Sequence, residues 1–439
     1  MRDNIGRKLH SFRLGRCTVE RLHATLSEPA QDSHQTLIVL TGSLVISASS
    51  RSSTSPWICL SSLGSRGLFH KLHCPTIHPG LYHITALAQD QSLTTTKNTR
   101  IAAFLHNGEF CIFHVDHSNP ASSRLQVTHT PIRRSARTSP VFQAVYHHPI
   151  LIALSESFSL SIYDMSAGAV RHSQTLTSFT SYPPTSLVLS APGPDMYKLI
   201  LTYSVPVYPR HWSVGVTEFI ISGPSRSPNS ITSKLSLSSL PHQSSIAQPM
   251  CVASTRSTRA VDVPQGWMDE DKHRYMQEQW SRKVARVSDT QTDGKWVVLA
   301  PADPAVFTAT SSSSPGTSVS NSNPMRFYSP TSLQLYRLSL PSPSPSVSAP
   351  RPKLTFIRNL QGHNGPVSSI AVADGRCVSL GADGSIWVWD LEAGTSTEVS
   401  GKHSEIFSDT HVDSGAVAFD ERRIVTARGG DIMIRRFDM

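Results

Sequence analysis

Short runs of alternating apolar and polar residues recur along the chain, and they predict β-strands rather than helices. The pattern is clearest between residues 360 and 391, where three such runs follow one another. Two Asp-Gly pairs, Asp374-Gly375 and Asp383-Gly384, separate the runs. Asp-Gly readily adopts the positive φ that a tight hairpin requires. This stretch therefore predicts a β-meander, in which consecutive strands pair as hairpins.

Similar apolar runs reach an aromatic or large aliphatic residue at seven places, most of them about 48 to 56 residues apart. These residues are Leu60, Phe113, Tyr163, Phe219, Tyr336, Trp389 and Phe437. Seven is a number of repeats at which radially arranged sheets close into a ring. The spacing predicts an all-β, seven-bladed β-propeller. The gap between Phe219 and Tyr336 is about twice the others, which leaves an eighth blade open as an alternative.

The long gap defines the main insertion of the predicted domain. We expect residues 222–325 to be one blade enlarged by Ser/Pro-rich, disordered loops and by a helix near 266–286. Packing of Trp267 and Tyr275 on the propeller is expected, and a partner-binding helix is the alternative. A second Pro/Ser tract, at 341–352, predicts a flexible loop.

The propeller itself is expected to span residues 26–439. Residues 1–25 lack the meander pattern and form a lead-in. A strand at 11–14 or at 18–22 could pair with the last blade and close the ring, which would hide an exposed sheet edge.

The stretch 360–391 resembles a WD (WD40) repeat, since Gly362-His363 opens it and Trp389-Asp390 ends its third strand. The resemblance implies that four side chains form a structural hydrogen-bonded chain, with no catalytic role. In this chain, Asp383 accepts from the His363 imidazole, whose other nitrogen reaches Ser379. Ser379 in turn reaches the Trp389 indole.

The following segment repeats this pattern in weaker form. His411 precedes Asp431 by 20 residues, as His363 precedes Asp383, and Phe437 stands where the first repeat has Trp389. The serine position is occupied by alanine, with Thr426 beside it. We therefore expect a blade here, with an incomplete polar network.

Composition narrows the function classes. The net charge is +9 and the pI about 9.4, but Lys and Arg are scattered, which argues for a generally basic surface and against a nucleic-acid site. Six cysteines without a C-x-x-C pair predict buried free thiols in a reducing compartment. The chain lacks a secretory signal and an apolar stretch long enough to span a membrane. We expect a cytoplasmic or nuclear protein without membrane association.

Candidate chemistry is sparse. His114, Asp116 and His117 lie close together in sequence, but a solvated loop explains them better than a metal site. Asp413-Ser414-Gly415 resembles an aspartic-protease turn without the second carboxylate that this chemistry needs. The sequence contains neither a G-x-S-x-G elbow nor a phosphate-binding G-x-x-x-x-G-K-[ST] loop. These observations predict a protein that is not an enzyme and that binds no cofactor or metal.

The resemblance implies a platform for other proteins, whose identity the sequence leaves open. The layout is similar to fungal F-box/WD proteins, which recruit substrates to an SCF-type ubiquitin ligase, although no F-box is seen ahead of the propeller. A scaffold in trafficking, chromatin or RNA processing is the alternative. Serines followed by proline are candidate phosphorylation sites that could control a partner, and they are Ser139, Ser227, Ser314, Ser329, Ser342 and Ser344.

Overall fold

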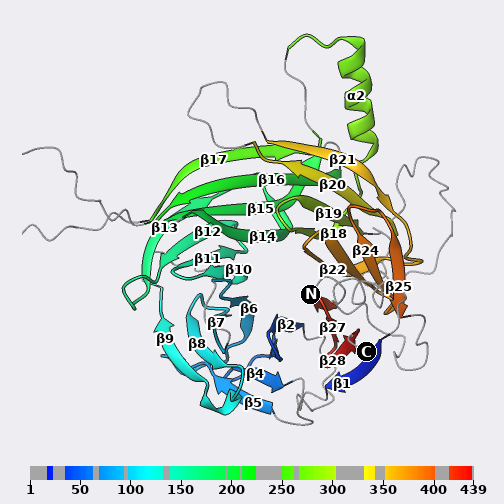
Figure 1. Ribbon diagram of the computed structural model, residues 1–439. Helices are drawn as coiled ribbons and strands as arrows, with labels where there is room; N and C mark the ends of the chain where they lie inside the picture. The colour runs from blue at the N-terminus through cyan, green and yellow to red at the C-terminus, as the bar shows by residue number, and fades with distance from the viewer. Residues whose placement is uncertain are drawn as a thin grey trace, which may run out of the picture.

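Seven four-stranded antiparallel sheets surround a common centre in the computed structural model (Figure 1). We number the sheets as blades 1 to 7 and name their strands A to D from the centre outward. The structure describes residues 17–22, 35–62, 69–92, 97–131, 139–193, 195–207, 210–223, 250–261, 266–302, 331–341, 352–400 and 415–437.

Each blade is a meander of consecutive strands, except the last. Blade 1 contains β2 (Thr36–Thr41), β3 (Leu44–Ser49), β4 (Trp57–Ser62) and β5 (Phe69–His73). Blade 2 contains β6 (Ile84–Gln89), β7 (Asn98–Leu105), β8 (Phe110–Asp116) and β9 (Arg124–His129), with the 3-10 helix η1 (Pro120–Ser122) before β9. Blade 3 contains β10 (Val141–His147), β11 (Ile150–Ser155), β12 (Ser159–Asp164) and β13 (Arg171–Thr177).

The next three blades follow the same order. Blade 4 contains β14 (Tyr182–Gly193), β15 (Met196–Val207), β16 (His211–Ser222) and β17 (Cys251–Arg259). Blade 5 contains β18 (Val287–Thr292), β19 (Trp296–Pro301), β20 (Leu333–Ser339) and β21 (Lys353–Leu360). Blade 6 contains β22 (Val367–Ala373), β23 (Arg376–Gly381), β24 (Ile386–Asp390) and β25 (Ser396–Ser400).

Blade 7 joins the two ends of the chain. Its first three strands are β26 (Ala416–Phe419), β27 (Arg423–Arg428) and β28 (Asp431–Arg436), and its fourth is β1 (Thr18–Leu22). β1 pairs antiparallel with β28, with Val19 opposite Arg435. Of the two segments that the sequence offers for ring closure, the structure uses 18–22. The pairing satisfies the outer edge of β28, which would otherwise be an exposed template for aggregation.

The core is divided among the spaces between blades. Seven clusters of buried apolar side chains are present in the described residues, and each lies between two neighbouring sheets. Between blades 1 and 2, for example, Ile46 and Leu60 meet Ile101 and Phe113, all of them almost fully buried. Strands covered on both faces read as continuous apolar runs, which is why the middle strands of each blade stand out in the sequence.

The seven-bladed prediction is confirmed, and the described residues form no eighth sheet. The stretch 222–325 is nevertheless less of an insertion than expected. It contains β17, the outermost strand of blade 4, together with β18 and β19, the first two strands of blade 5.

The predicted helix is α2 (Glu270–Ser281), which projects from the ring between blades 4 and 5 (Figure 1). Asp269 caps its N-terminus by accepting a hydrogen bond from the Lys272 N–H. The expected packing on the propeller is wrong, because Trp267 is 86% exposed and Tyr275 is 48% exposed. Trp267 precedes the first turn, and Gln279 is the one buried residue of the helix.

The strand order also sorts the loops into two faces. Successive antiparallel strands alternate in direction, so A–B and C–D turns lie on one face, which we call the A–B face. B–C turns and the D–A loops between blades lie on the other, which we call the D–A face. Backbone pairing agrees: Trp212, at the B–C turn of blade 4, bridges Val284 in the following D–A loop.

Candidate functional site

The four residues of the predicted structural network meet inside blade 6. The Trp389 Nε1–H donates to Ser379 Oγ over 2.8 Å, and Ser379 Oγ lies 2.6 Å from His363 Nε2. All three side chains are buried. On the other side of the ring, His363 Nδ1 lies 3.0 Å from Ser385 Oγ, and this hydroxyl donates to Asp383 Oδ1 over 2.6 Å.

Ser385 is the member that sequence reasoning missed. We expected Asp383 to accept directly from the imidazole, but the Ser385 hydroxyl stands between them. The Asp383 carboxylate also accepts from the Ser385 N–H and so fixes the tight turn. Space at this point is limited, since a Cβ on Gly381 would lie 2.4 Å from Asp383 Oδ1. The sequence contained an indication of this contact, because Ser385 directly follows the Asp383-Gly384 turn and its hydroxyl can reach the Asp383 carboxylate.

The donors and acceptors of this network run in one direction. A carboxylate only accepts, so the Ser385 hydroxyl donates to Asp383 and accepts from His363 Nδ1–H. His363 Nε2 then accepts from the Ser379 hydroxyl, which itself accepts from Trp389. This order requires a neutral imidazole, and burial lowers the pKa of His363 to about 4, with the charge of Asp383 opposing. Burial alone would raise the pKa of Asp383, but its hydrogen bonds to Ser385 and the nearby His363 lower it. The network links β23, β24 and the loop ahead of β22 inside blade 6.

The weaker repeat in blade 7 is held differently. His411 lies outside the described residues, Asp431 pairs with Arg21 of β1, and Phe437 is buried. In the interior, Arg435 donates to Thr426 Oγ1 over 3.1 Å. Burial lowers the pKa of Arg435. The blade therefore forms with an arginine–threonine contact between β28 and β27.

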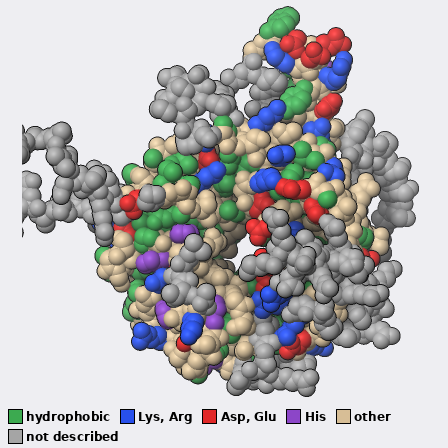
Figure 2. Space-filling view, in the orientation of Figure 1, with side chains coloured by type: hydrophobic (Ala, Val, Ile, Leu, Met, Phe, Trp, Pro, Cys, Tyr) green, Lys and Arg blue, Asp and Glu red, His purple; other side chains and the backbone are tan. Residues whose placement is uncertain are grey.

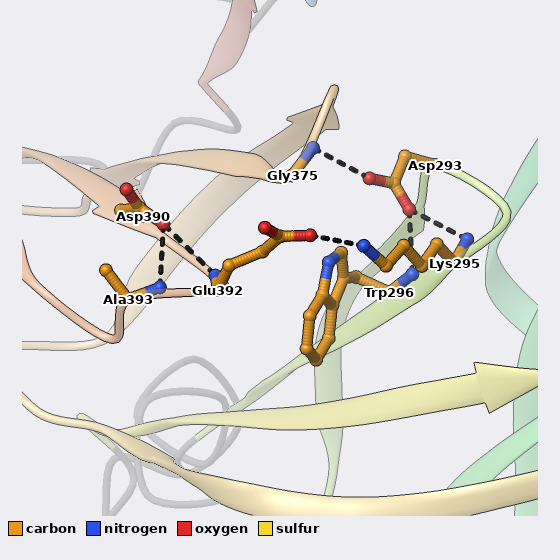
Figure 3. A network of polar contacts seen from close by, with 7 residues as sticks. All are labelled: Asp293, Lys295, Trp296, Gly375, Asp390, Glu392 and Ala393. Atoms are coloured by element: carbon orange, nitrogen blue, oxygen red, sulfur yellow. Dashed lines mark hydrogen bonds and ion pairs between the residues drawn. The ribbon is translucent and has the colours of Figure 1, made fainter. Parts of the chain in front are cut away.

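A polar network on the A–B face joins blades 5 and 6 (Figure 3). Asp293 directly follows β18, and its carboxylate accepts from the N–H groups of Lys295, Trp296 and, across the blade boundary, Gly375. Lys295 forms an ion pair with Glu392 of blade 6. Asp90 occupies the same position after β6 and accepts from the His148 N–H of blade 3 over 2.9 Å. These contacts hold neighbouring blades together.

Of the clustered histidine and aspartate residues, His114 and Asp116 lie in β8 and His117 directly follows it. Asp116 accepts hydrogen bonds from its own loop, at Ser118 and Ser122, while His117 lies 3.4 Å from Thr41 Oγ1 of blade 1. Within the described residues, no group of three His, Cys, Asp or Glu side chains is arranged to hold a metal ion. Histidines are gathered over blades 2 and 3 (Figure 2).

Of the six candidate phosphorylation sites, the structure describes one, Ser139. Its Oγ accepts from the Ser157 N–H over 3.1 Å, which places it on the D–A face. The other five, Ser227, Ser314, Ser329, Ser342 and Ser344, lie outside the described residues, as does the Asp413-Ser414 turn.

Seven of the exposed large hydrophobic side chains in the described residues belong to D–A connections or to strand starts beside them. Ile77, Leu81, Phe179 and Tyr182 lie at the D–A face, whereas Trp267, Met268 and Tyr275 belong to the α2 segment, which projects from the ring. The remaining four, Val19, Leu125, Met196 and Ile357, lie on outermost strands or in an A–B turn. The interblade cores do not include these side chains, so those at the D–A face remain available for contact with other molecules.

Three aromatic residues on this face, Phe179, Tyr182 and Trp212, form what we call the aromatic patch. The rings of Tyr182 and Trp212 meet edge to face, with centroids 5.5 Å apart. Trp212 also packs against the core between blades 4 and 5, which holds the Tyr182–Trp212 pair in place.

Hydrophobic, acidic and basic side chains lie together on α2, at the top of Figure 2.

Comparison with known proteins identifies the fold family. A family model described as the F-box protein pof12 β-propeller matches residues 24–413, which is most of the chain. A search of curated proteins finds no significant match. No helix in the described residues is long and apolar enough to cross a membrane.

Three solved structures illustrate the similarity of shape. The Cps50 (Swd1) β-propeller domain of Myceliophteria thermophila is 9% identical, with a TM-score of 0.47, and the match covers 96% of this chain and 99% of that one. BamB from Moraxella catarrhalis is 10% identical with a TM-score of 0.40, covering 95% and 98%. The computationally designed Ika8 protein is 12% identical with a TM-score of 0.39, covering 91% and 82%. These likenesses add nothing to the family assignment.

Proposed function

The chain belongs to the F-box protein pof12 β-propeller family, and from this premise we propose that it is the substrate-recognition part of an SCF-type ubiquitin ligase. The coarser statement, a propeller domain that acts as a protein-binding scaffold, follows from the family. The finer role joins two contacts in one protein: an F-box region that binds the ligase through a Skp1-type adaptor, and a propeller that holds the substrate.

The observation that carries the proposal is the uneven surface of the ring. On the A–B face, the Asp90 and Asp293 side chains link neighbouring blades and so stabilise the fold. The exposed apolar side chains of the D–A face have no such role, with Phe179 88% exposed and Leu81 65% exposed. A substrate bound there would cover apolar surface, which is the main favourable contribution to protein association.

Co-purification of the full-length protein from its native cells tests the proposal. We expect a Skp1-type adaptor in the purified material, together with a protein that becomes ubiquitinated. Absence of the adaptor from the full-length preparation would overturn the ligase role. A scaffold in trafficking, chromatin or RNA processing would then be the outcome.

A further inference from the structure

We propose that the aromatic patch, with its neighbours Arg210 and Lys283, is a docking site for an acidic partner segment that carries an aromatic anchor between Asp or Glu residues. This inference rests on the proposed function in one respect, namely that the propeller binds proteins. The site lies on the D–A face where blades 3, 4 and 5 meet.

The loop between blades 3 and 4 presents the most exposed part of the site. The hydroxyls of Ser178 and Ser181 lie 2.9 Å apart, and the Ser178 N–H donates to Phe158 O. These bonds hold a short turn, with Phe179 at its tip. A phenylalanine that is 88% exposed contributes nothing to the core, and its hydration is unfavourable. Covering Phe179 with a partner would recover that free energy.

The floor of the site is rigid. Trp212 and Val284 exchange backbone hydrogen bonds of 2.7 and 2.9 Å, which tie the α2-bearing loop to the start of β16. Tyr182 packs edge to face on the Trp212 ring. Aromatic side chains held in this way lose little conformational entropy on binding, so they are efficient anchors.

Charge indicates which partner fits. Arg210 is exposed and Lys283 is half-buried, and within the described part of the chain neither has a carboxylate at ion-pair distance. The charge of Lys283 reaches the site. Burial is the main cause that lowers the pKa of His211, the residue before Trp212, and the charge of Lys283 is the second. The site therefore presents two basic side chains, Arg210 and Lys283. A segment with carboxylates on both sides of an apolar anchor complements this arrangement.

Fluorescence anisotropy with the full chain tests the site. The probe is a fluorescein-labelled peptide with one tryptophan between two runs of glutamate, measured at low salt. Two control peptides replace the tryptophan by alanine or the glutamates by lysine. We expect saturable binding of the probe below about 1 mM, and weaker binding of both control peptides.

Variants then locate the binding. Phe179→Ala is expected to weaken binding at least about tenfold, and Arg210→Glu at least about fivefold. Leu125→Ala removes an exposed apolar residue of the outermost strand β9, and Arg422→Glu reverses an exposed charge on the A–B face; both are expected to bind like wild type. Because Phe179 is highly exposed, Phe179→Ala should leave the fold intact. Circular dichroism of the variant checks this.

Three results would overturn the proposal: no saturable binding, equal binding of the lysine peptide, or losses in the controls as large as those in Phe179→Ala. The outcome is separable from that of the ligase role. Peptide binding without a co-purified adaptor leaves the site standing and removes the ligase function. A co-purified adaptor without peptide binding does the reverse.

Discussion

Replacing Ser379 by alanine isolates the buried network of blade 6. The Ser379 hydroxyl is fully buried, accepts from the Trp389 N–H and donates to His363 Nε2. Alanine fits the same space, but it leaves one buried donor and one buried acceptor without a partner. Each orphaned group costs about 1–3 kcal/mol. We therefore expect the free energy of unfolding to fall by about 2–6 kcal/mol.

Ser204 offers a matched control. It is also a buried strand serine, but its Oγ has no hydrogen-bond partner among the described residues. Ser204→Ala removes a buried polar group that is already unsatisfied, so it should leave stability unchanged or raise it. Urea unfolding followed by tryptophan fluorescence, with m-values compared, measures both variants. Equal effects of the two substitutions would refute the network.

Three further predictions concern pH, blade contacts and ring closure. The pKa of His363 is about 4 in the folded protein and about 6.5 in the unfolded protein, so the unfolded state binds the proton first as the pH falls. The contribution of His363 to folding stability is therefore complete above pH 6.5 and is lost as the pH falls toward 4. Over this interval, the free energy of unfolding of wild type should fall by about 3 kcal/mol more than that of His363→Gln. An equal pH dependence of the two proteins in urea unfolding would contradict this prediction. Asp90→Ala leaves Arg100 and the His148 N–H without their carboxylate and should cost about 3 kcal/mol, whereas the half-exposed Asp431→Ala should cost under about 1 kcal/mol. Deleting residues 1–22 removes β1 and exposes the edge of β28, so size-exclusion chromatography should show self-association; a stable monomer would argue against ring closure by β1.

The middle strands of the blades could be predicted because burial on both faces gives them a continuous apolar pattern. Leu60 lies in β4 and Trp389 in β24, while Phe437 directly follows β28. The outermost strand β17 (Cys251–Arg259) escaped notice because it faces solvent and reads as a polar Ser/Thr/Arg run. β18 (Val287–Thr292) is also largely polar. An apolar pattern therefore finds the centre of a blade and misses its edges.

The candidate site was less accessible from sequence. The WD-repeat pattern pointed to His363, Ser379 and Trp389, which contact one another in the structure. The bridging position of Ser385 depends on how far a hydroxyl reaches in the folded turn. Phe179 and Trp212 are 33 residues apart and lie at or just before the starts of different strands of blade 4, so the folded meander of that blade brings them to one surface. A local sequence motif does not reveal such a surface.

The central claim, a partner protein held on the D–A face, is tested most directly by photo-cross-linking from both faces. A benzophenone amino acid would replace Phe179 on the D–A face or Met196 on the A–B face, in full-length protein expressed with a Skp1-type adaptor. We expect position 179 to cross-link a protein that becomes ubiquitinated and whose half-life lengthens when this chain is removed. Equal cross-linking of that protein from position 196, or its cross-linking from 196 alone, would contradict the account.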